Sequence, residues 1–286
     1  MKGLPGFFAD YQGRVSAEIG RLVKGSSPVE RAMAYTATAP SKQVRAVLTI
    51  LCAELCGGPA ARAIPAAASI ELVHASSLIL DDLPAMDDAP LRRGLPANHL
   101  AFDESTAILA AFGLLNLAYA TFARSYEPSL AARLATLTSD AVGPDGLIGG
   151  QALDLAATDQ RISFDILERI HRGKTGALFV AAASCGAAIA GAGQDSISAL
   201  AAYAKNLGLA FQIVDDLLDV EGDPAQTGKA VREDARKTTF VSFSGVDGAR
   251  QLAAELCQTA DRALAAFGAK ADPLRQLSAF VAERRM

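Results

Sequence analysis

The sequence predicts an all-α fold in which a single domain covers residues 1–286. Ala and Leu dominate the chain, and apolar residues recur at spacings of three and four, as they do on the buried face of a helix. Few stretches alternate apolar and polar residues as strands do. The 286 residues, 51% of them hydrophobic, can bury one large core near the upper size limit of a single domain. No Ser/Gly linker and no repeat of fixed period divides the chain.

The helical pattern is clearest in a series of segments that Gly and Pro separate. These segments are residues 44–56, 65–80, 105–124, 129–142, 163–190, 195–219 and 248–267. Several are apolar nearly all round, which is typical of helices buried inside a bundle. Breaks such as Gly57-Gly58-Pro59 contain the residues that end helices. The strongly polar stretch 222–237 is expected to form a loop or lid beside the helix that ends at Asp219.

Charge and cysteine content narrow the class of protein. The net charge is −4, so the chain lacks the basic surface of a nucleic-acid-binding protein, and an anionic substrate would need local cations. Cys52 and Cys56 are four apart, but no second ligand pair follows at zinc-finger spacing, so the cysteines are interpreted as core residues in a reducing, cytoplasmic compartment. The N-terminus lacks the apolar region of a signal peptide. No apolar run free of Gly, Pro and charge reaches the length of a bilayer span, so we expect no membrane span.

Two clusters of aspartates stand out, because each directly follows an apolar helix. The first contains Asp81, Asp82, Asp87 and Asp88, and the second contains Asp215, Asp216 and Asp219. Carboxylates are rarely buried, and negative charge near the carbonyl end of a helix is unfavourable without a cation. Each cluster therefore predicts a bound positive charge.

The spacing of the aspartates favours a divalent metal. Asp215 and Asp219 are four apart and project from one face of a helix, whereas Asp216 lies about 100° round it. Two carboxylates on one face supply the hard oxygen ligands that suit Mg²⁺, which also takes oxygens from a phosphate. In the first cluster, Pro84 disturbs the helix, and geometry alone leaves open whether Asp87 or Asp88 accompanies the leading pair. A single cluster can be a solvated acidic helix end, but two in one all-α chain favour a functional site.

Several cations accompany the clusters and predict a diphosphate site, with metal on one side and Arg or Lys donors on the other. They are Lys42, Arg45, Arg92, Arg93, Lys174, Lys229 and Lys237. Lys174 is the most informative, because a lysine within so apolar a helix requires an anionic partner. A lone histidine on an apolar helix, such as His74, is ordinarily a satisfied core residue, and His99 and His171 are interpreted as structural.

Four segments, in this order, resemble the trans-polyprenyl diphosphate synthases, the family of farnesyl and geranylgeranyl diphosphate synthases. The segments are residues 74–99, 149–155, 173–176 and 211–219. The resemblance implies an all-α isoprenoid-synthase helical bundle around a central cavity, in a homodimeric, cytoplasmic enzyme. It implies a magnesium-dependent transferase of alkyl groups. Such an enzyme joins isopentenyl diphosphate head-to-tail to an allylic diphosphate through a carbocation, and here the product would be geranylgeranyl or farnesyl diphosphate.

The resemblance also assigns roles to individual residues. It implies metal-binding motifs at Asp81, Asp82 and Asp87 and at Asp215, Asp216 and Asp219, which together would hold three Mg²⁺. Arg92, Lys174 and Lys229 would contact the allylic diphosphate, and Lys42, Arg45, His74 and Arg93 would bind isopentenyl diphosphate. Thr175 and Gln212 match the pair that lines the developing cation. The expected catalytic residues are thus Lys174, Thr175 and Gln212, with Asp81 and Asp215.

Some positions depart from the family pattern and keep alternatives open. Gln43 stands where the family carries an arginine, Ala89-Pro90 ends the acidic run early, and the loop before Lys237 is short. Ser76, five before Asp81, leaves room for a long product, unless Phe112 on the neighbouring helix restores a floor. A class I terpene cyclase or a non-catalytic regulatory subunit are the competing interpretations; the intact aspartate motifs oppose both, and Lys42, Arg45 and Arg93 also oppose the cyclase.

Overall fold

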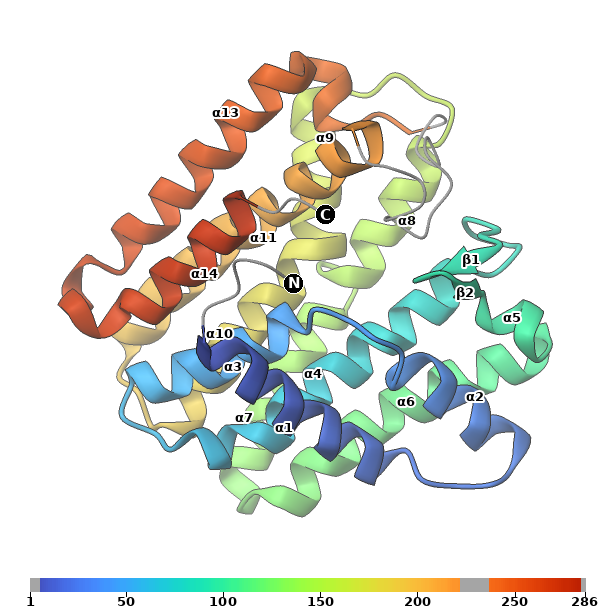
Figure 1. Ribbon diagram of the computed structural model, residues 1–286, viewed down its shortest axis with the longest axis horizontal. Coiled ribbons are helices and arrows are strands. Elements are labelled where there is room, and N and C mark those ends of the chain that lie inside the picture. Colours follow the sequence, from blue (N-terminus) through green and yellow to red (C-terminus); the bar gives the residue numbers. More distant parts are fainter. Residues whose placement is uncertain (1–5, 222–236, 284–286) are drawn as a thin grey trace.

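The computed structural model describes residues 6–221 and 237–283, and it confirms the predicted all-α fold (Figure 1). In the first half the helices are α1 (Gly6–Leu22), α2 (Pro28–Ala37), α3 (Val44–Leu55), α4 (Ala60–Asp81), α5 (Asn98–Ala101) and α6 (Glu104–Ser125). Between α4 and α5, the short strands β1 (Leu91–Arg92) and β2 (Leu95–Pro96) form an antiparallel hairpin.

The second half continues in the same way. It contains α7 (Pro128–Val142), α8 (Leu147–Ala157), α9 (Phe164–His171), a π-helical turn η1 (Arg172–Gly176), α10 (Ala177–Ile189), α11 (Gln194–Glu221), α13 (Phe240–Ala263), the 3₁₀ segment η3 (Ala265–Ala271) and α14 (Asp272–Ala282). The predicted helix over 163–190 is therefore divided by η1 into α9 and α10. The predicted helix over 248–267 begins earlier, at Phe240, and bends at Gly245, whose φ is 68°.

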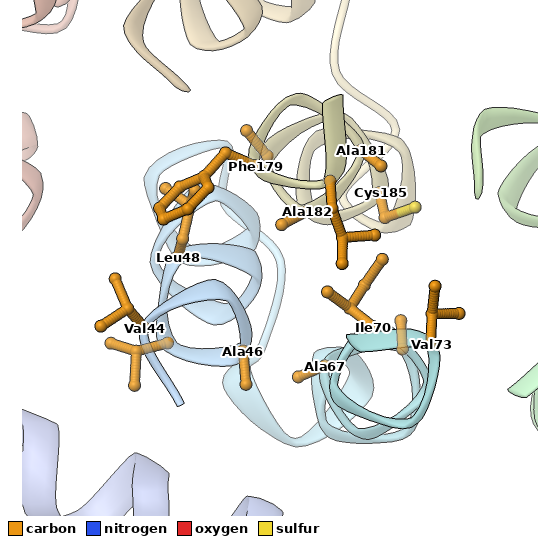
Figure 2. Close-up of a cluster of buried hydrophobic side chains, with 14 of the residues drawn as sticks. Val44, Ala46, Leu48, Ala67, Ile70, Val73, Phe179, Ala181, Ala182 and Cys185 are labelled. Carbon is orange, nitrogen blue, oxygen red and sulfur yellow. The ribbon is translucent and has the colours of Figure 1, made fainter. Parts of the chain in front are cut away.

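The main core lies where α3, α4 and α10 pack side by side (Figure 2). Their buried residues include Val44, Ala46 and Leu48 of α3, Ala67, Ile70 and Val73 of α4, and Ala182, Cys185 and the larger Phe179 of α10. The helices α3 and α10 approach so closely at Gly186 that a Cβ atom there would lie 2.2 Å from the carbonyl oxygen of Thr49. Alanine and glycine thus let these helices pack closely enough to hold the polar side chains at their ends in fixed positions.

A second, smaller core joins α9, α11 and α13. It contains Leu167, Ile213, Leu217 and Phe240, with Ala253 toward the middle of α13. This cluster fixes the C-terminal part of α11, which carries the second aspartate cluster.

Within the part of the chain that the structure describes, three helices are long and apolar enough, by length and composition alone, to cross a membrane: α4, α6 and residues 194–220 of α11. In the fold these helices pack against other helices, and 67% of the apolar window of α4 is buried inside the protein. The corresponding windows of α6 and α11 are buried to 39% and 50%, so burial in the core accounts for most of the hydrophobicity of α4 and for only part of that of the other two helices.

Candidate functional site

The first aspartate cluster lies at the C-terminal end of α4, in a turn that folds back on the helix. Asp81 is the last residue of α4 and Asp82 follows it as the C-cap. The amide of Asp87 donates a hydrogen bond to the carbonyl oxygen of Asp81 at 3.0 Å, so Asp87 returns to the helix end. Asp88 has a φ of 49° and is exposed. The geometry that the sequence left open therefore brings Asp87, not Asp88, beside Asp81.

Lys174 lies among three carboxylates, as its apolar surroundings predicted. Its Nζ atom is 2.7 Å from Asp154 Oδ2, 3.2 Å from Asp81 Oδ1 and 4.0 Å from Asp87 Oδ2. Burial alone would lower the pKa of Lys174, but Asp81 and Asp154 outweigh burial and raise it above its ordinary value. The π-helical geometry of η1, which places Lys174 outside a regular helix, is frequent at functional sites.

Lys237, which lies just before α13, contacts two of the same three carboxylates. Its Nζ atom lies 2.8 Å from Asp87 Oδ1 and 3.1 Å from Asp154 Oδ2. Burial alone would raise the pKa of Asp154, but Lys174 and Lys237 together hold it below its ordinary value. Lys237 thus belongs to the site, a point that the short preceding loop had left in doubt, whereas Lys229 lies outside the described residues.

Gln151 and Asp154 were not among the predicted site residues. Both lie on α8, where Gln151 Nε2 donates to Asp81 Oδ1 at 2.5 Å and Asp154 binds the two lysines. α8 packs so closely on η1 that a Cβ at Gly150 would lie 2.1 Å from the amide nitrogen of Lys174. Two polar residues three apart in an otherwise apolar segment are the sequence signal that could have identified them.

Asp82 and Arg92 form a buried ion pair beside the cluster. The Asp82 side chain is 2% exposed, and Arg92 Nε lies 2.9 Å from Oδ1 and 3.1 Å from Oδ2, with a further contact from Nη2. Burial raises the pKa of Asp82, and Arg92 opposes that rise. Arg92 comes from β1, so the hairpin is tied to the end of α4.

The second cluster lies near the C-terminal end of α11, joined to η1 by hydrogen bonds. Thr175 Oγ1 donates to Gln212 Oε1 at 2.9 Å, and Gln212 Nε2 donates to Asp216 Oδ1 at 3.0 Å. The amide of Phe240, at the start of α13, donates to Asp216 Oδ2 at 3.0 Å. Asp216 is buried, whereas Asp215 and Asp219 are partly exposed, as their positions around the helix predicted.

Arg45, His74 and Arg93 form a basic group between α3, α4 and the hairpin. Arg45 Nη1 lies 3.5 Å from His74 Nε2, and its guanidinium lies over the ring of Phe179 at 4.6 Å. Burial, followed by Arg45 and Arg93, holds the pKa of His74 well below its ordinary value, so the imidazole is neutral. His74 is thus a neutral contact of Arg45.

Lys42 lies just before α3, the helix that carries Arg45. α3 begins only at Val44, because Gln43 adopts a left-handed conformation with a φ of 49°. Gln43, which replaces the family's arginine, is buried and donates from Nε2 to Ser16 Oγ of α1 at 2.9 Å.

Phe112 does not provide a floor beside Ser76 within this chain. Its side chain is 64% exposed on α6, whereas Ser76 is buried and donates from Oγ to the carbonyl oxygen of Ala111 at 2.8 Å. Neighbouring residues on a helix point about 100° apart, so Ala111 faces Ser76 while Phe112, the next residue on α6, points to the surface.

The donor set suits a divalent cation. Among the described residues, no three His, Cys, Asp or Glu side chains converge closely enough to hold a metal by themselves. Asp81 and Asp87, however, approach one cation, the Lys174 ammonium, from two sides. Mg²⁺ usually takes one or two carboxylates and completes its shell with water and phosphate oxygens, so these residues fit such an ion together with a diphosphate.

The chain is similar over most of its length to proteins of known kind. The family model described as polyprenyl synthetase matches residues 26–263. Geranylgeranyl pyrophosphate synthase 9, chloroplastic, of Arabidopsis thaliana is 40% identical over 90% of this chain and 74% of its own length. An FPP/GFPP synthase from Zymomonas mobilis, solved in apo form, has a TM-score of 0.86 and 32% identity over 96% of this chain and 97% of its own. A geranyltransferase from Helicobacter pylori, solved with magnesium and isoprenyl diphosphate, has a TM-score of 0.85 and 27% identity over 97% of both chains.

Proposed function

Because the chain belongs to the polyprenyl synthetase family, we propose that it is a short-chain trans-prenyltransferase that joins isopentenyl diphosphate to an allylic diphosphate. The observation that carries this proposal is the convergence of Lys174 and Lys237 on Asp81, Asp87 and Asp154. A diphosphate held through metal ions needs carboxylates and fixed cations in one place, and this cluster supplies both.

Members of this family use a divalent metal, and we propose that here it is Mg²⁺, in the three-ion arrangement of the family. The partly exposed Asp81, Asp87, Asp215 and Asp219 would supply the ligand oxygens. Asp82 and Asp216, which the resemblance assigns as ligands, would also hold their neighbours in place, since Arg92 binds the oxygens of Asp82 and the Phe240 amide binds one oxygen of Asp216. The metal ions would stabilise the negative charge that develops on the departing diphosphate.

The chain's own residues account for the rest of the reaction. The allylic C–O bond breaks and its electron pair leaves with the diphosphate, whose charge Lys174, Lys229 and Arg92 stabilise. The Thr175 and Gln212 side-chain dipoles face the resulting allylic cation.

Isopentenyl diphosphate, held by Lys42, Arg45, His74 and Arg93, then supplies the π electrons of the new C–C bond. The departed diphosphate accepts the proton that is lost. The apolar walls of the predicted central cavity exclude the water that would quench the cation.

The product is proposed to be geranylgeranyl or farnesyl diphosphate. Ser76 is small and faces α6, so the chain places no large side chain at this position to stop a growing tail. The names of relatives such as the geranylgeranyl pyrophosphate synthases support the same range.

The protein is further proposed to be a homodimer in a reducing compartment, the cytoplasm, without a membrane span. α6 carries Ile108, Leu109 and Phe112 at 37%, 55% and 64% exposure, an apolar face that a second copy would cover. All four cysteines are free thiols, as is typical of a reducing environment.

A product assay tests the proposed reaction. Purified protein is incubated with Mg²⁺, labelled isopentenyl diphosphate and each allylic primer in turn, and the products are sized by chromatography. Elongated diphosphates are expected. A cyclic hydrocarbon formed from the allylic substrate alone would assign the chain to the terpene cyclases, and absence of turnover with every primer would assign it to the regulatory subunits.

A further inference from the structure

Glu71 is a buried carboxylate to which the proposed reaction gives no role. It lies on α4, three residues before His74, and is 7% exposed. Glutamate is almost never buried unless its charge and oxygens have partners, because desolvation of a carboxylate is costly. The partners of Glu71 therefore indicate what it does.

One partner is the backbone of α3. This helix begins after the left-handed Gln43 and has no side-chain cap of its own, so amides of its first turn lack intrahelical acceptors. Glu71 Oε1 accepts a hydrogen bond from the amide of Ala46 at 3.1 Å. A carboxylate from α4 thus caps the first turn of α3 from outside, at the positive end of that helix.

Two guanidinium groups also act on the charge of Glu71. Burial raises the pKa of Glu71, and both Arg45 and Arg93 act against that rise. Burial in turn lowers the pKa of Arg93, and Glu71 is the strongest influence in the opposite direction. His74 is neutral, so it adds no charge to this group. Arg45 and Arg93 thus favour the charged form of Glu71, and Glu71 favours the charged form of Arg93.

Glu71 acts on Arg45 in two ways, through the backbone of the next residue and through its charge. Ala46, whose amide Glu71 binds, directly follows Arg45, and the Arg45 carbonyl accepts a hydrogen bond from Thr49 Oγ1 at 3.0 Å. The guanidinium itself is confined by the rings of Phe179 and Phe211, at 4.6 and 5.8 Å. Both ends of the Arg45 side chain are thus fixed in direction.

We propose that Glu71 is a positioning residue for isopentenyl diphosphate, which caps α3 and counters the charge of Arg45 and Arg93 so that both guanidiniums are ordered before the substrate arrives. This inference rests on the proposed function, because that function assigns Arg45 and Arg93 to the isopentenyl half of the site. Glu71 itself does not touch the substrate.

The test compares two substitutions and a control on the same helix. Glu71→Met removes both the cap and the charge at similar length, whereas Glu71→Gln keeps an oxygen for the Ala46 amide. We expect Glu71→Met to raise KM for isopentenyl diphosphate about tenfold and Glu71→Gln by about threefold, with KM for the allylic primer nearly unchanged. Ser69→Ala removes a buried hydroxyl that bonds only within α4, to the carbonyl of Pro65, and should change neither constant.

Loss of the carboxylate also removes negative charge beside an anion site, which alone would lower KM. We expect the disorder of the two arginines to outweigh this effect and to raise KM, because an unrestrained arginine loses rotamer freedom each time it binds substrate. A fall in KM for isopentenyl diphosphate would identify Glu71 as a competing anion and overturn the inference, as would equal changes in both KM values.

Calorimetric titration with isopentenyl diphosphate separates this inference from the proposed function. In an Arg45→Met background, Glu71→Met should cause a smaller further loss of affinity than it causes in the wild type, because only Arg93 is left to position, whereas a merely structural role would add its full effect. If the wild type binds isopentenyl diphosphate without turnover, the proposed function fails while the comparison of affinities still decides the role of Glu71. If the wild type does not bind it, both are overturned.

Hydrogen exchange covers the case in which Glu71→Met does not fold. In the wild type, the Ala46 amide should be protected like an interior helical amide, because it has a buried acceptor. Exchange at the rate of a frayed first turn would refute the cap.

Discussion

At the scale of single residues, the site depends on which carboxylates meet a cation. Asp81 and Asp87 approach Lys174, and Lys237, which lies just before α13, adds a second ammonium beside Asp87. Under the proposed function, divalent ions and a diphosphate would replace these lysine contacts, because the carboxylates are only partly buried, with the Asp87 side chain 24% exposed. The lysines would then donate to the phosphate oxygens.

Asp87 and Asp88 are neighbours in sequence with different expected roles, which makes them a matched pair. Asp87→Asn should lower kcat by about a hundredfold and raise the Mg²⁺ concentration needed for half-maximal rate, because it removes a metal ligand. Asp88→Asn, on an exposed residue with a positive φ, should leave both within about twofold. Rates measured across a Mg²⁺ titration check this, and a larger effect at Asp88 would reverse the assignment.

At the scale of elements, the position of the catalytic groups depends on close packing between helices. α3 and α10 meet at Gly186, and α8 meets η1 at Gly150. In each place a side chain would collide with backbone of the other element, so the glycines set how near Arg45 and Lys174 come to their partners.

Gly186→Ala tests the α3–α10 contact. Alanine favours a helix over glycine by about 1 kcal/mol, but a Cβ at 2.2 Å from the Thr49 carbonyl must push the helices apart. We expect the free energy of unfolding to fall by about 2 kcal/mol, measured by urea denaturation. Gly13→Ala on α1, where a Cβ meets nothing within 4 Å, should instead be neutral or stabilising. Stabilisation at both positions would contradict the contact.

At the scale of the whole molecule, α6 presents apolar side chains that the single chain leaves exposed. Leu109 and Phe112, three apart, are 55% and 64% exposed on one face of this helix. Burial of such a face against its symmetry mate is the simplest account of its composition.

Phe112→Glu should therefore convert a dimer to a monomer at micromolar concentration, because it places two charges in an apolar interface. Sedimentation velocity gives the measurement. Ile166→Glu, at an apolar position 43% exposed on α9, controls for the loss of surface hydrophobicity and should leave the dimer intact. A monomeric wild type would refute the interface.

Much of this architecture is encoded locally and could be predicted. Apolar periodicity predicted the long central helices, and the helical period placed Asp215 and Asp219 on one face of theirs. The helices α1, α2, α8 and α14 were not among the predicted segments. What could not be predicted depends on how distant elements meet. The choice of Asp87 required the shape of a turn, and the Asp154–Lys174 pair required knowledge that α8 packs against η1. Periodicity predicts which way a side chain points from its own helix, but it does not predict which residue of another helix it will contact.

The double use of Asp216 bears on how the C-terminal region can vary. One oxygen accepts from Gln212 and the other from the first amide of α13, so one carboxylate joins the proposed catalytic centre to the start of the last helices. A substitution or truncation that moves α13 along its axis would shift Asp216 and so change the hydrogen bonds of Gln212 and Thr175, although those residues lie outside α13. Selection on turnover therefore extends to residues whose own surroundings contain no substrate, and an inactive Asp216 variant would be evidence about architecture as much as about metal.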